Sequence, residues 1–381
     1  MSNRKALFIC IYESLSNDYN FSLIKYLKER SIEVDYLNFD ENTNLNYKEA
    51  LISLGIRIIN IRKNKIRQNK IRHLFNALKY IIVLIRYIVC KNYDYIIAVD
   101  YQLNILAFLL KKALFKKYRL VYIIQEMYQY SIKNQIIKQI VLNLDKKAQK
   151  DSLCILNRNE LRKDYIDRIN PSITKKHIVT YNGVYKYTTK YRSYHLRDNI
   201  NIIYAGSIRF GLLDFLMKIA ESFQVNKMRF KLNIYGLNDH ELKEWSRIII
   251  ERYPEINRKI NLNRKVTNEN IIRILENTDL GIIYYPNDGF ASINELLSAP
   301  SKLFELIGQL VPIISYGSAF ADKIIKEYKI GIVINKISDI KNIPNKIVEE
   351  YPVYIKNLNK MRENNIFVRD KEILKVASFL E

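Results

Sequence analysis

Short apolar runs alternate with helical patterns through the first 180 residues of the chain. Residues 6–12 and 33–38 have the composition of strands, and residues 21–30 between them have helical spacing. The continuous apolar runs at 95–100 and 120–124 are typical of strands buried on both faces. This alternation predicts a parallel sheet built from βαβ units. The other predicted elements are strands at 56–61, 153–157 and 177–180 and helices at 67–91, 104–116 and 132–150.

The alternation restarts after an irregular stretch, residues 186–198, that is rich in Tyr, Lys and Arg. We interpret this stretch as an interdomain linker. The pattern predicts two consecutive doubly wound α/β domains, and in such sheets ligands bind at the carboxyl ends of the strands. The predicted elements of the second domain are strands at 201–205, 231–235, 260–262, 280–284 and 311–315 and helices at 212–224, 241–253, 268–277 and 301–309.

Composition agrees with two large domains and indicates an anionic partner. The chain of 381 residues is longer than a domain with a single hydrophobic core usually is. Its content of 48% hydrophobic residues excludes global disorder. The chain carries 62 Lys and Arg against 39 Asp and Glu, which is a formal net charge of +23. Such a surplus suits nucleic acid, an acidic membrane face or a phosphate-bearing substrate.

The cysteines and apolar runs bear on the compartment. Cys10, Cys90 and Cys154 are far apart and lack CxxC spacing, so we expect a reducing cytoplasm without disulfides or structural zinc. The apolar amino terminus is more typical of a first strand than of a signal peptide. The most membrane-like stretch, residues 77–90, is interrupted by two cations and is shorter than the roughly 20 apolar residues of a spanning helix.

Few motifs in the chain carry chemistry. It contains no GxGxxG, no GxxxxGK(S/T) and no Asp-x-Asp pair, and its four histidines are scattered, so no metal site is predicted. In the informative segment, 279–317, a buried strand leads through a polar loop to a helix. We expect Ser301 to cap that helix, where the first amides and Lys302 attract anions. Glu305, one turn further on, could accept hydrogen bonds from a ribose diol.

This segment resembles the nucleotide-binding region of GT-B glycosyltransferases, especially the glycosyltransferase family 4-like group. A stretch similar to S-x-K-L-F-E-Y-L-A-x-G-x-P-V-I recurs in that group, and residues 301–305 and Pro312 match it. The resemblance covers essentially the whole chain. Four shorter matches follow in the order of the family, at residues 181–184, 204–207, 233–236 and 266–279.

The resemblance implies an α/β fold of GT-B architecture, with two Rossmann-like doubly wound domains facing a central cleft. Residues 1–196, joined by a C-terminal helix at 366–381, would bind the acceptor. Residues 197–365 would bind a nucleotide-sugar donor, and a UDP-sugar is favoured. Arg209 and Lys302 would stabilise the departing diphosphate in place of a metal while a glycosyl unit passes to an acceptor hydroxyl, so no cofactor is expected.

Individual donor contacts also follow from the resemblance. Glu305 would hold the ribose, and the backbone of residues 265–267 would border the base. Asp288 resembles the acid that holds the donor sugar. The donor-binding set is Gly206, Ser207, Arg209, Gly236, Lys265, Val266, Thr267, Ser301, Lys302, Leu303 and Glu305.

Other interpretations of these residues stay open. Lys302 and Glu305 could form only an exposed ion pair on one helix, and Asp288 could be an ordinary turn residue. Arg209 could be a surface arginine that follows a turn. Family members separate their two acids by seven residues, whereas sixteen separate Asp288 from Glu305, so retention of the anomeric configuration stays open.

The first predicted domain carries a basic run without acids. Residues 50–93 contain ten Lys or Arg interleaved with Ile, Leu, Phe and Tyr. This run suits an anionic membrane face with a lipid-linked saccharide acceptor, and a solvated charged surface is the alternative. Asp100 and Glu126 lie at or just past the ends of predicted strands. Each could be an acceptor-side base or a capping carboxylate.

Three other functions are compatible with these patterns. An inverting transferase or a UDP-GlcNAc epimerase can have the same fold, and a basic membrane- or nucleic-acid-binding protein could carry a decayed donor site. No recognised nucleic-acid-binding signature supports the last function. We therefore predict a cytoplasmic glycosyltransferase of bacterial-type surface polysaccharide or glycan assembly, in peripheral contact with the inner face of the cell membrane.

Overall fold

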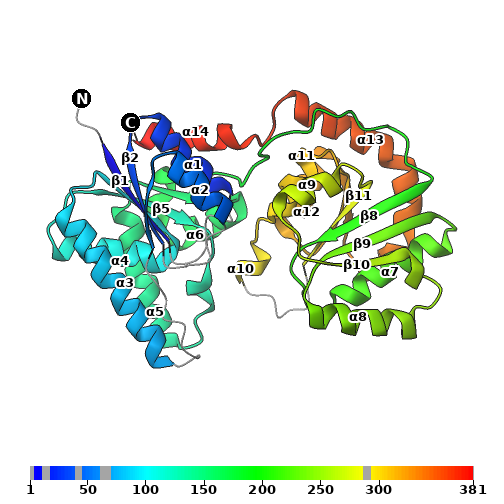
Figure 1. Cartoon of the computed structure of the whole chain (residues 1–381), viewed down its shortest axis with the longest axis horizontal. Helices are drawn as coiled ribbons and strands as arrows, with labels where there is room; N and C mark the ends of the chain where they lie inside the picture. Colours follow the sequence, from blue (N-terminus) through cyan, green and yellow to red (C-terminus); the bar gives the residue numbers. More distant parts are fainter. Residues whose placement is uncertain (1–3, 11–17, 39–44, 61–69, 286–292, 381) are drawn as a thin grey trace. The chain divides into compact units, whose positions relative to one another are not determined.

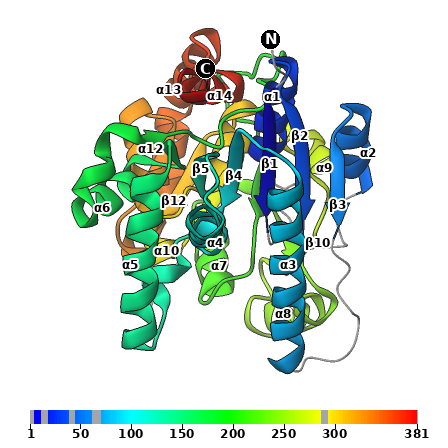
Figure 2. The same cartoon turned by 90° about the vertical axis from the view of Figure 1, so that its left-hand side faces the viewer.

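The structure is a computed structural model that describes residues 4–10, 18–38, 45–60, 70–285 and 293–380 (Figures 1 and 2). It divides into two compact units, which we call unit 1 and unit 2. Unit 1 comprises Met1–Asn182 and Arg369–Glu381, and unit 2 comprises Gly183–Val368. A parallel sheet covered by helices forms the centre of each unit.

Unit 1 is built on a seven-stranded sheet. Its strands are β1 (Lys5–Cys10), β2 (Glu33–Asn38), β3 (Arg57–Asn60), β4 (Tyr95–Val99), β5 (Arg119–Ile124), β6 (Cys154–Asn157) and β7 (His177–Val179). They run parallel in the order β3-β2-β1-β4-β5-β6-β7, so the direction of winding reverses between β1 and β4. A reversal of this kind opens a crevice at the carboxyl edge of a sheet.

Helices cover both faces of this sheet. They are α1 (Asp18–Glu29), α2 (Leu45–Ser53), α3 (Lys70–Cys90), α4 (Asp100–Ala113), α5 (Gln135–Asp151), α6 (Glu160–Ile169) and α14 (Arg369–Leu380). In β4, Ile97 and Val99 join the core with α1 and α14, whereas Ile96 and Ala98 join the core with α3 and α4. Burial on both faces is the reason that β4 and β5 are continuous apolar runs in the sequence.

Unit 2 repeats the design with six parallel strands in the order β10-β9-β8-β11-β12-β13, and its winding reverses between β8 and β11. The strands are β8 (Asn199–Ala205), β9 (Arg229–Leu237), β10 (Ile260–Arg264), β11 (Leu280–Tyr284), β12 (Ile313–Tyr316) and β13 (Gly331–Ile334). The helices are α7 (Leu212–Val225), α8 (Asp239–Arg252), α9 (Asn268–Leu275), α10 (Ile293–Leu296), α11 (Ser301–Gly308), α12 (Ala319–Tyr328) and α13 (Ile343–Glu363).

The structure confirms the predicted alternation of strands and helices and adds elements that the apolar pattern did not reveal. Among these, α2, α6, α12 and α13 are helices and β13 is a strand. α13 continues for 21 residues although Pro352 lies inside it. Burial of Tyr351, Tyr354 and Ile355 in the unit 2 core offsets the helical hydrogen bond that proline removes.

Residues 186–198 contain little regular structure, as the sequence predicted, and they belong to unit 2. The Arg192 guanidinium donates hydrogen bonds to the carbonyl oxygens of Gln309, at 2.7 Å, and of Thr278. The Thr188 amide donates to the Gly308 carbonyl at 2.8 Å. These bonds tie the stretch to the ends of α9 and α11.

Candidate active site

Two glycines bring backbone close to backbone at the carboxyl edge of the unit 2 sheet. Gly206 follows β8, and Gly236 is the penultimate residue of β9. The Gly206 amide donates to the Tyr235 carbonyl at 3.3 Å. A Cβ on Gly236 would lie 2.2 Å from the Gly206 carbonyl oxygen, and the φ of Gly236 is +117°. Only glycine satisfies both constraints, so this edge is formed by bare backbone.

Tyrosine hydroxyls hold the loop between β8 and α7. Tyr204 donates to the Ser207 carbonyl at 2.6 Å, and Tyr284 of β11 donates to the Phe210 carbonyl at 2.8 Å. Gly211, with a φ of +71°, begins the turn into α7, and a Cβ there would lie 2.8 Å from the Tyr284 hydroxyl oxygen. The loop is therefore fixed across the switch point between β8 and β11.

Arg209 lies in this loop and meets residues that follow β11. Its guanidinium carbon stacks over the Tyr285 ring at 4.0 Å from the centroid. Its Nη1 lies 3.4 Å from Oε1 of Glu295 in α10, and 24% of the Arg209 side chain is exposed. Arg209 is thus a positioned, accessible cation whose paired carboxylate an anionic ligand could replace.

The α11 helix begins beside the same edge. The expectation that Ser301 caps this helix was wrong: Pro300 occupies the N-cap position with an extended conformation, and Ser301 is the first helical residue. Gly281 of β11 lets the helix pack closely, because a Cβ there would lie 2.3 Å from Leu306. Leu303 is fully buried, so it can offer a ligand only its backbone.

Lys302 and Glu305 form the ion pair that the sequence left open. Lys302 Nζ lies 2.6 Å from Glu305 Oε2, and their side chains are 31% and 25% exposed. The pair is accessible and lies in the first turns of α11, where amides favour an anion. A diphosphate could therefore draw Lys302 away from Glu305 and leave that carboxylate to accept other hydrogen bonds.

The remaining donor-side residues connect β10 to α9. Lys265 and Thr267 are exposed and Val266 is half-buried. Thr267 caps α9, with its side chain accepting a hydrogen bond from the Asn270 amide at 3.4 Å. Asp288 lies outside the described residues. Sequence reasoning missed Tyr285 and Glu295, although Tyr285 directly follows a buried strand, which is a usual position for a ligand contact.

Asp100 bridges two strand ends of unit 1. It was predicted to end a strand but instead begins α4, with a φ of +65°. Its Oδ1 accepts hydrogen bonds from the amides of Gln125 and Glu126, both at 2.9 Å, just past β5. Burial of the Asp100 carboxyl raises its pKa to about 6, against the lowering effect of these two bonds. The Asp100 carboxylate therefore ties the start of α4 to the residues that follow β5.

Two arginines that the sequence did not single out accompany Asp100. Arg162, 2% exposed, donates from Nη1 to the Gln125 carbonyl, and its Nη2 lies 3.7 Å from Glu126 Oε2. Arg158, also 2% exposed, stacks over the Tyr19 ring at 3.9 Å. Burial lowers the pKa of the Arg158 guanidinium. Acids and cations therefore alternate along the carboxyl edge of the unit 1 sheet.

The described residues lack two other kinds of feature. No cluster of three or more His, Cys, Asp or Glu in the described ranges could hold a metal ion. Among the described helices, none is both long and apolar enough to cross a membrane.

Comparison with a family of known domains identifies part of the chain. Residues 216–369 match the family described as Glucosyltransferase 3-like, C-terminal domain. No curated protein matches the sequence of this chain.

Solved structures match over almost the whole chain. A glycosyltransferase from Rickettsia africae ESF-5 has a TM-score of 0.73 at 13% identity, covering 99% of this chain and 98% of that one. Anabaena Alr3699/HepE in complex with UDP-glucose has a TM-score of 0.70 at 12% identity, covering 99% of each chain. Sucrose-phosphate synthase from Thermosynechococcus elongatus has a TM-score of 0.70 at 12% identity, covering 99% and 98%.

These matches confirm the predicted GT-B glycosyltransferase at the level of the fold and of the domain at 216–369. The identities are low, so the solved structures speak for the fold alone. The family 4-like assignment and the roles of individual site residues stay predictions.

Proposed function

We propose that this chain, with its GT-B fold and Glucosyltransferase 3-like C-terminal domain, transfers a glycosyl unit from a nucleotide-diphosphate sugar to an acceptor hydroxyl. The observation that carries the proposal is the domain match over residues 216–369, which includes Lys302 and Glu305. A UDP-sugar is the favoured donor, because the similar HepE structure contains UDP-glucose.

The donor would bind at the carboxyl edge of the unit 2 sheet. Gly206 and Gly236 let the ends of β8 and β9 approach closely, and Arg209 lies in the adjoining loop. Arg209, Lys302 and the first amides of α11 would stabilise the departing diphosphate in place of a metal. Glu305 would then accept hydrogen bonds from the ribose.

The base and the sugar would lie at either side of the diphosphate. The backbone of residues 265–267, between β10 and α9, would border the base. Asp288, outside the described residues, is the proposed contact to the donor sugar. Retention of configuration is part of the proposal and depends on that acid.

The acceptor would bind unit 1, where Asp100 and Glu126 follow neighbouring strands. A carboxyl whose pKa is about 6 can accept a proton from a hydroxyl near neutral pH. If the reaction inverts configuration, replacing Asp100 or Glu126 should abolish transfer, and if it retains configuration, both variants should keep part of it. Analysis of the anomeric product separates the two, and product formed without any acceptor would indicate an epimerase.

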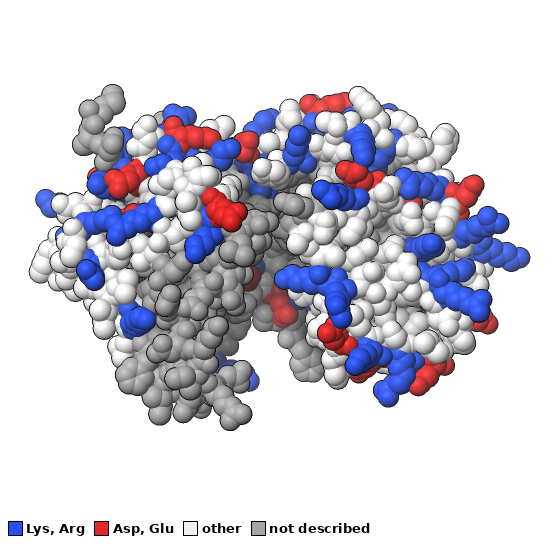
Figure 3. All heavy atoms as spheres, in the orientation of Figure 1, with Lys and Arg blue, Asp and Glu red and all other residues white. Residues whose placement is uncertain are grey.

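The surface of the protein supports contact with anionic material. Lys and Arg side chains are spread over the face of both units shown in Figure 3, with acids interspersed among them. On α3, the exposed residues Leu78, Ile82 and Val89 alternate with the exposed cations Lys79 and Arg86. We extend the proposal to a lipid-linked saccharide acceptor at an anionic membrane face, as in assembly of surface polysaccharide. Failure to pellet with anionic vesicles at low salt would contradict it.

Calorimetry with UDP, GDP and CMP tests the donor site. Wild type should bind one nucleotide, with UDP favoured, and Lys302→Ala and Glu305→Ala should each weaken it roughly 10-fold, because each loses a hydrogen bond to a charged group. Lys190→Ala is the control, since it breaks an exposed ion pair with Glu276 in the same unit. Failure of all three nucleotides to bind wild type, or unchanged binding in both site variants, contradicts the donor site.

A further inference from the structure

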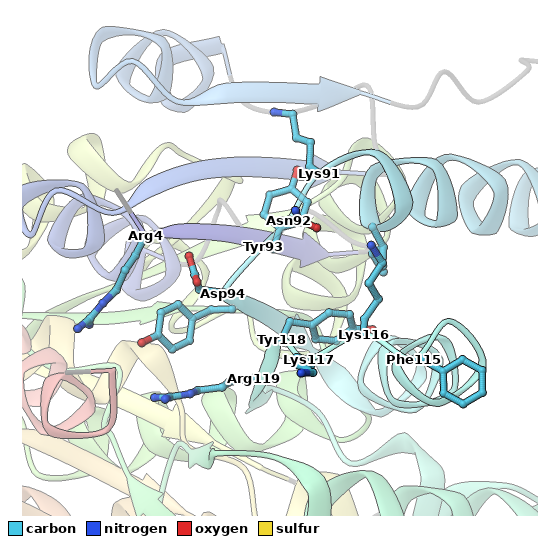
Figure 4. A pocket seen from close by; sticks show the side chains of 12 residues that line it. Arg4, Lys91, Asn92, Tyr93, Asp94, Phe115, Lys116, Lys117, Tyr118 and Arg119 are labelled. Carbon is cyan, nitrogen blue, oxygen red and sulfur yellow. The ribbon is translucent and has the colours of Figure 1, made fainter. Parts of the chain in front are cut away.

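A cavity of about 580 Å³ lies at the amino-terminal edge of the unit 1 sheet (Figure 4). It is lined by the residues that lead into β1, β4 and β5, chiefly the loops at 91–94 and 115–118. Asp100 and Glu126 follow the opposite ends of β4 and β5. Five or six strand residues at about 3.3 Å each therefore separate the cavity from them. The proposed acceptor chemistry does not use this cavity.

Cations dominate the lining. Three of them contact the protein: Arg4 donates to the Leu380 carbonyl at 2.7 Å, Lys91 pairs with Asp35 at 2.6 Å, and Lys116 donates to the Val89 carbonyl at 3.4 Å. The single lining acid is Asp94, whose carboxylate accepts from the Lys5 amide at 2.7 Å. The lining cations are Arg4, Lys91, Lys116, Lys117 and Arg119.

Two of these cations are placed to receive an anion. Within the described residues, the side chains of Lys117 and Arg119 have no hydrogen-bond or ion-pair partner, and both residues are exposed. Lysines that follow a helix end can be explained by the helix dipole, which accounts for Lys117 after α4. That explanation does not extend to Arg4 and Arg119, which stand at the starts of strands. In the view of Figure 4 these two arginines extend to the same side of the cavity.

Phe115 on the rim combines two unfavourable features. Its ring is 91% exposed, and its φ of +51° is a left-handed conformation that favours glycine or asparagine at a helix end. Figure 4 shows the ring at the far end of the cavity from Arg4. The Phe115 ring gains little from folding, whereas an apolar side chain beside lysines suits a membrane surface.

We propose that this cavity binds the phosphate headgroup of an anionic membrane lipid. Lys117 and Arg119 meet the phosphate oxygens, and Phe115, at the end of the cavity away from Arg4, enters the headgroup region. The apolar rim favours a lipid over a free phosphate, because a soluble ligand would not use it. The site orients unit 1 on a membrane; it rests on the membrane contact of the proposed function but not on sugar transfer.

Flotation with vesicles tests the site, using phosphatidylcholine mixed with phosphatidylglycerol against pure phosphatidylcholine. Lys117→Gln with Arg119→Gln should weaken binding to the mixed vesicles roughly 30-fold, at about 1 kcal/mol for each cation near the surface. Lys147→Gln with Lys175→Gln is the control, because both residues are exposed lysines of unit 1 outside the cavity lining and the same charge is removed. Equal losses in the two double variants would indicate general charge attraction and overturn the site.

Phe115→Asn gives a second, independent measurement. Asparagine tolerates the left-handed conformation, so the melting temperature should stay the same or rise while vesicle binding weakens about 10-fold. A simply structural Phe115 would instead lower the melting temperature and leave binding unchanged, which would overturn its role. Calorimetry with glycerol 3-phosphate completes the test, because binding of this soluble phosphate without vesicle binding would overturn the lipid assignment. UDP binding should be unchanged in all of these variants.

Discussion

The carboxyl edges of the two sheets hold their charged groups in opposite ways. In unit 2, Arg209 and Lys302 are partly exposed, and each pairs with a partly exposed carboxylate, at 3.4 Å and 2.6 Å. Pairs of this kind contribute at most about 1 kcal/mol. An anionic ligand can therefore replace the carboxylate partner of either cation at a small cost in free energy. The edge is ready to receive an anion.

In unit 1, the described strand ends of the corresponding edge hold buried charged side chains. Arg158 and Arg162 are 2% exposed, and the Asp100 carboxylate accepts hydrogen bonds from two backbone amides. The position that follows β4 carries a left-handed aspartate, where unit 2 uses glycines at its strand ends. These groups hold loops in place and shift each other's pKa, which suits proton transfer better than anion binding.

The comparison teaches that one topology can give two kinds of site. The winding reverses in both sheets, and this creates a crevice in each. The two sites differ in the residues at the strand ends: glycines let two strand ends of unit 2 approach closely, and a buried charge network holds the strand ends of unit 1.

The largest expected effect tests the bare backbone of unit 2. Gly236→Ala should abolish UDP binding and lower the free energy of unfolding by about 3 kcal/mol or more, because its Cβ would collide with the Gly206 carbonyl. Thermal unfolding and calorimetry measure the two effects. Gly55→Ala is the matched control, since Gly55 has a φ of +68° but its Cβ would meet only the flexible end of the Lys28 side chain, at 3.8 Å. That control should lose only about 1 kcal/mol, and an equal loss in both variants would refute the importance of close approach.

An intermediate effect tests whether the unit 2 cations are exchangeable. Arg209→Ala should weaken UDP binding roughly 10- to 100-fold, because it removes a charge-assisted hydrogen bond. Glu295→Gln should strengthen binding a few-fold, since Arg209 no longer has a competing carboxylate. Isothermal calorimetry of both variants provides the comparison. Weaker binding in Glu295→Gln would mean that Glu295 positions Arg209 and does not compete with the donor.

The smallest effect tests the charge network of unit 1. The Asp100 pKa of about 6 lies above its ordinary value of 3.8, so the folded state binds the proton more tightly than the unfolded state. Stability from this proton is present at low pH and is lost as the pH rises from about 4 through 6. Asp100→Asn keeps the acceptor oxygen without the charge. At pH 8 this variant should therefore have a higher melting temperature than wild type. Its free energy of unfolding should be higher by at most about 3 kcal/mol.

That difference in melting temperature should shrink as the pH is lowered toward 4. Glu126→Gln gives a comparison variant, because it removes the neighbouring charge that helps to raise the Asp100 pKa and keeps the Asp100 carboxyl itself. A difference between Asp100→Asn and wild type that does not change with pH would show that the Asp100 carboxyl is not perturbed.

Local patterns were good predictors of the strands and poor predictors of helix starts. β2 and β11 lie where the apolar runs placed them, at 33–38 and 280–284, because a buried strand leaves a run that no helix of that length produces. Ser301 was expected to cap α11, but the chain turns one residue earlier, at Pro300. Capping depends on the direction from which the chain enters a helix, and that direction is set by the packing of α11 on Gly281.

The sequence by itself determined two doubly wound parallel sheets, because these follow from local periodicity. It also determined the resemblance to GT-B glycosyltransferases, because this depends on short motifs. Only the tertiary structure decided which charges meet. Arg209 and Glu295 are 86 residues apart, and Asp100 and Glu126 are 26 residues apart. Parallel strands bring such residues together across a crossover connection, and the energy of a contact depends on the distance and burial that result, which no local pattern records.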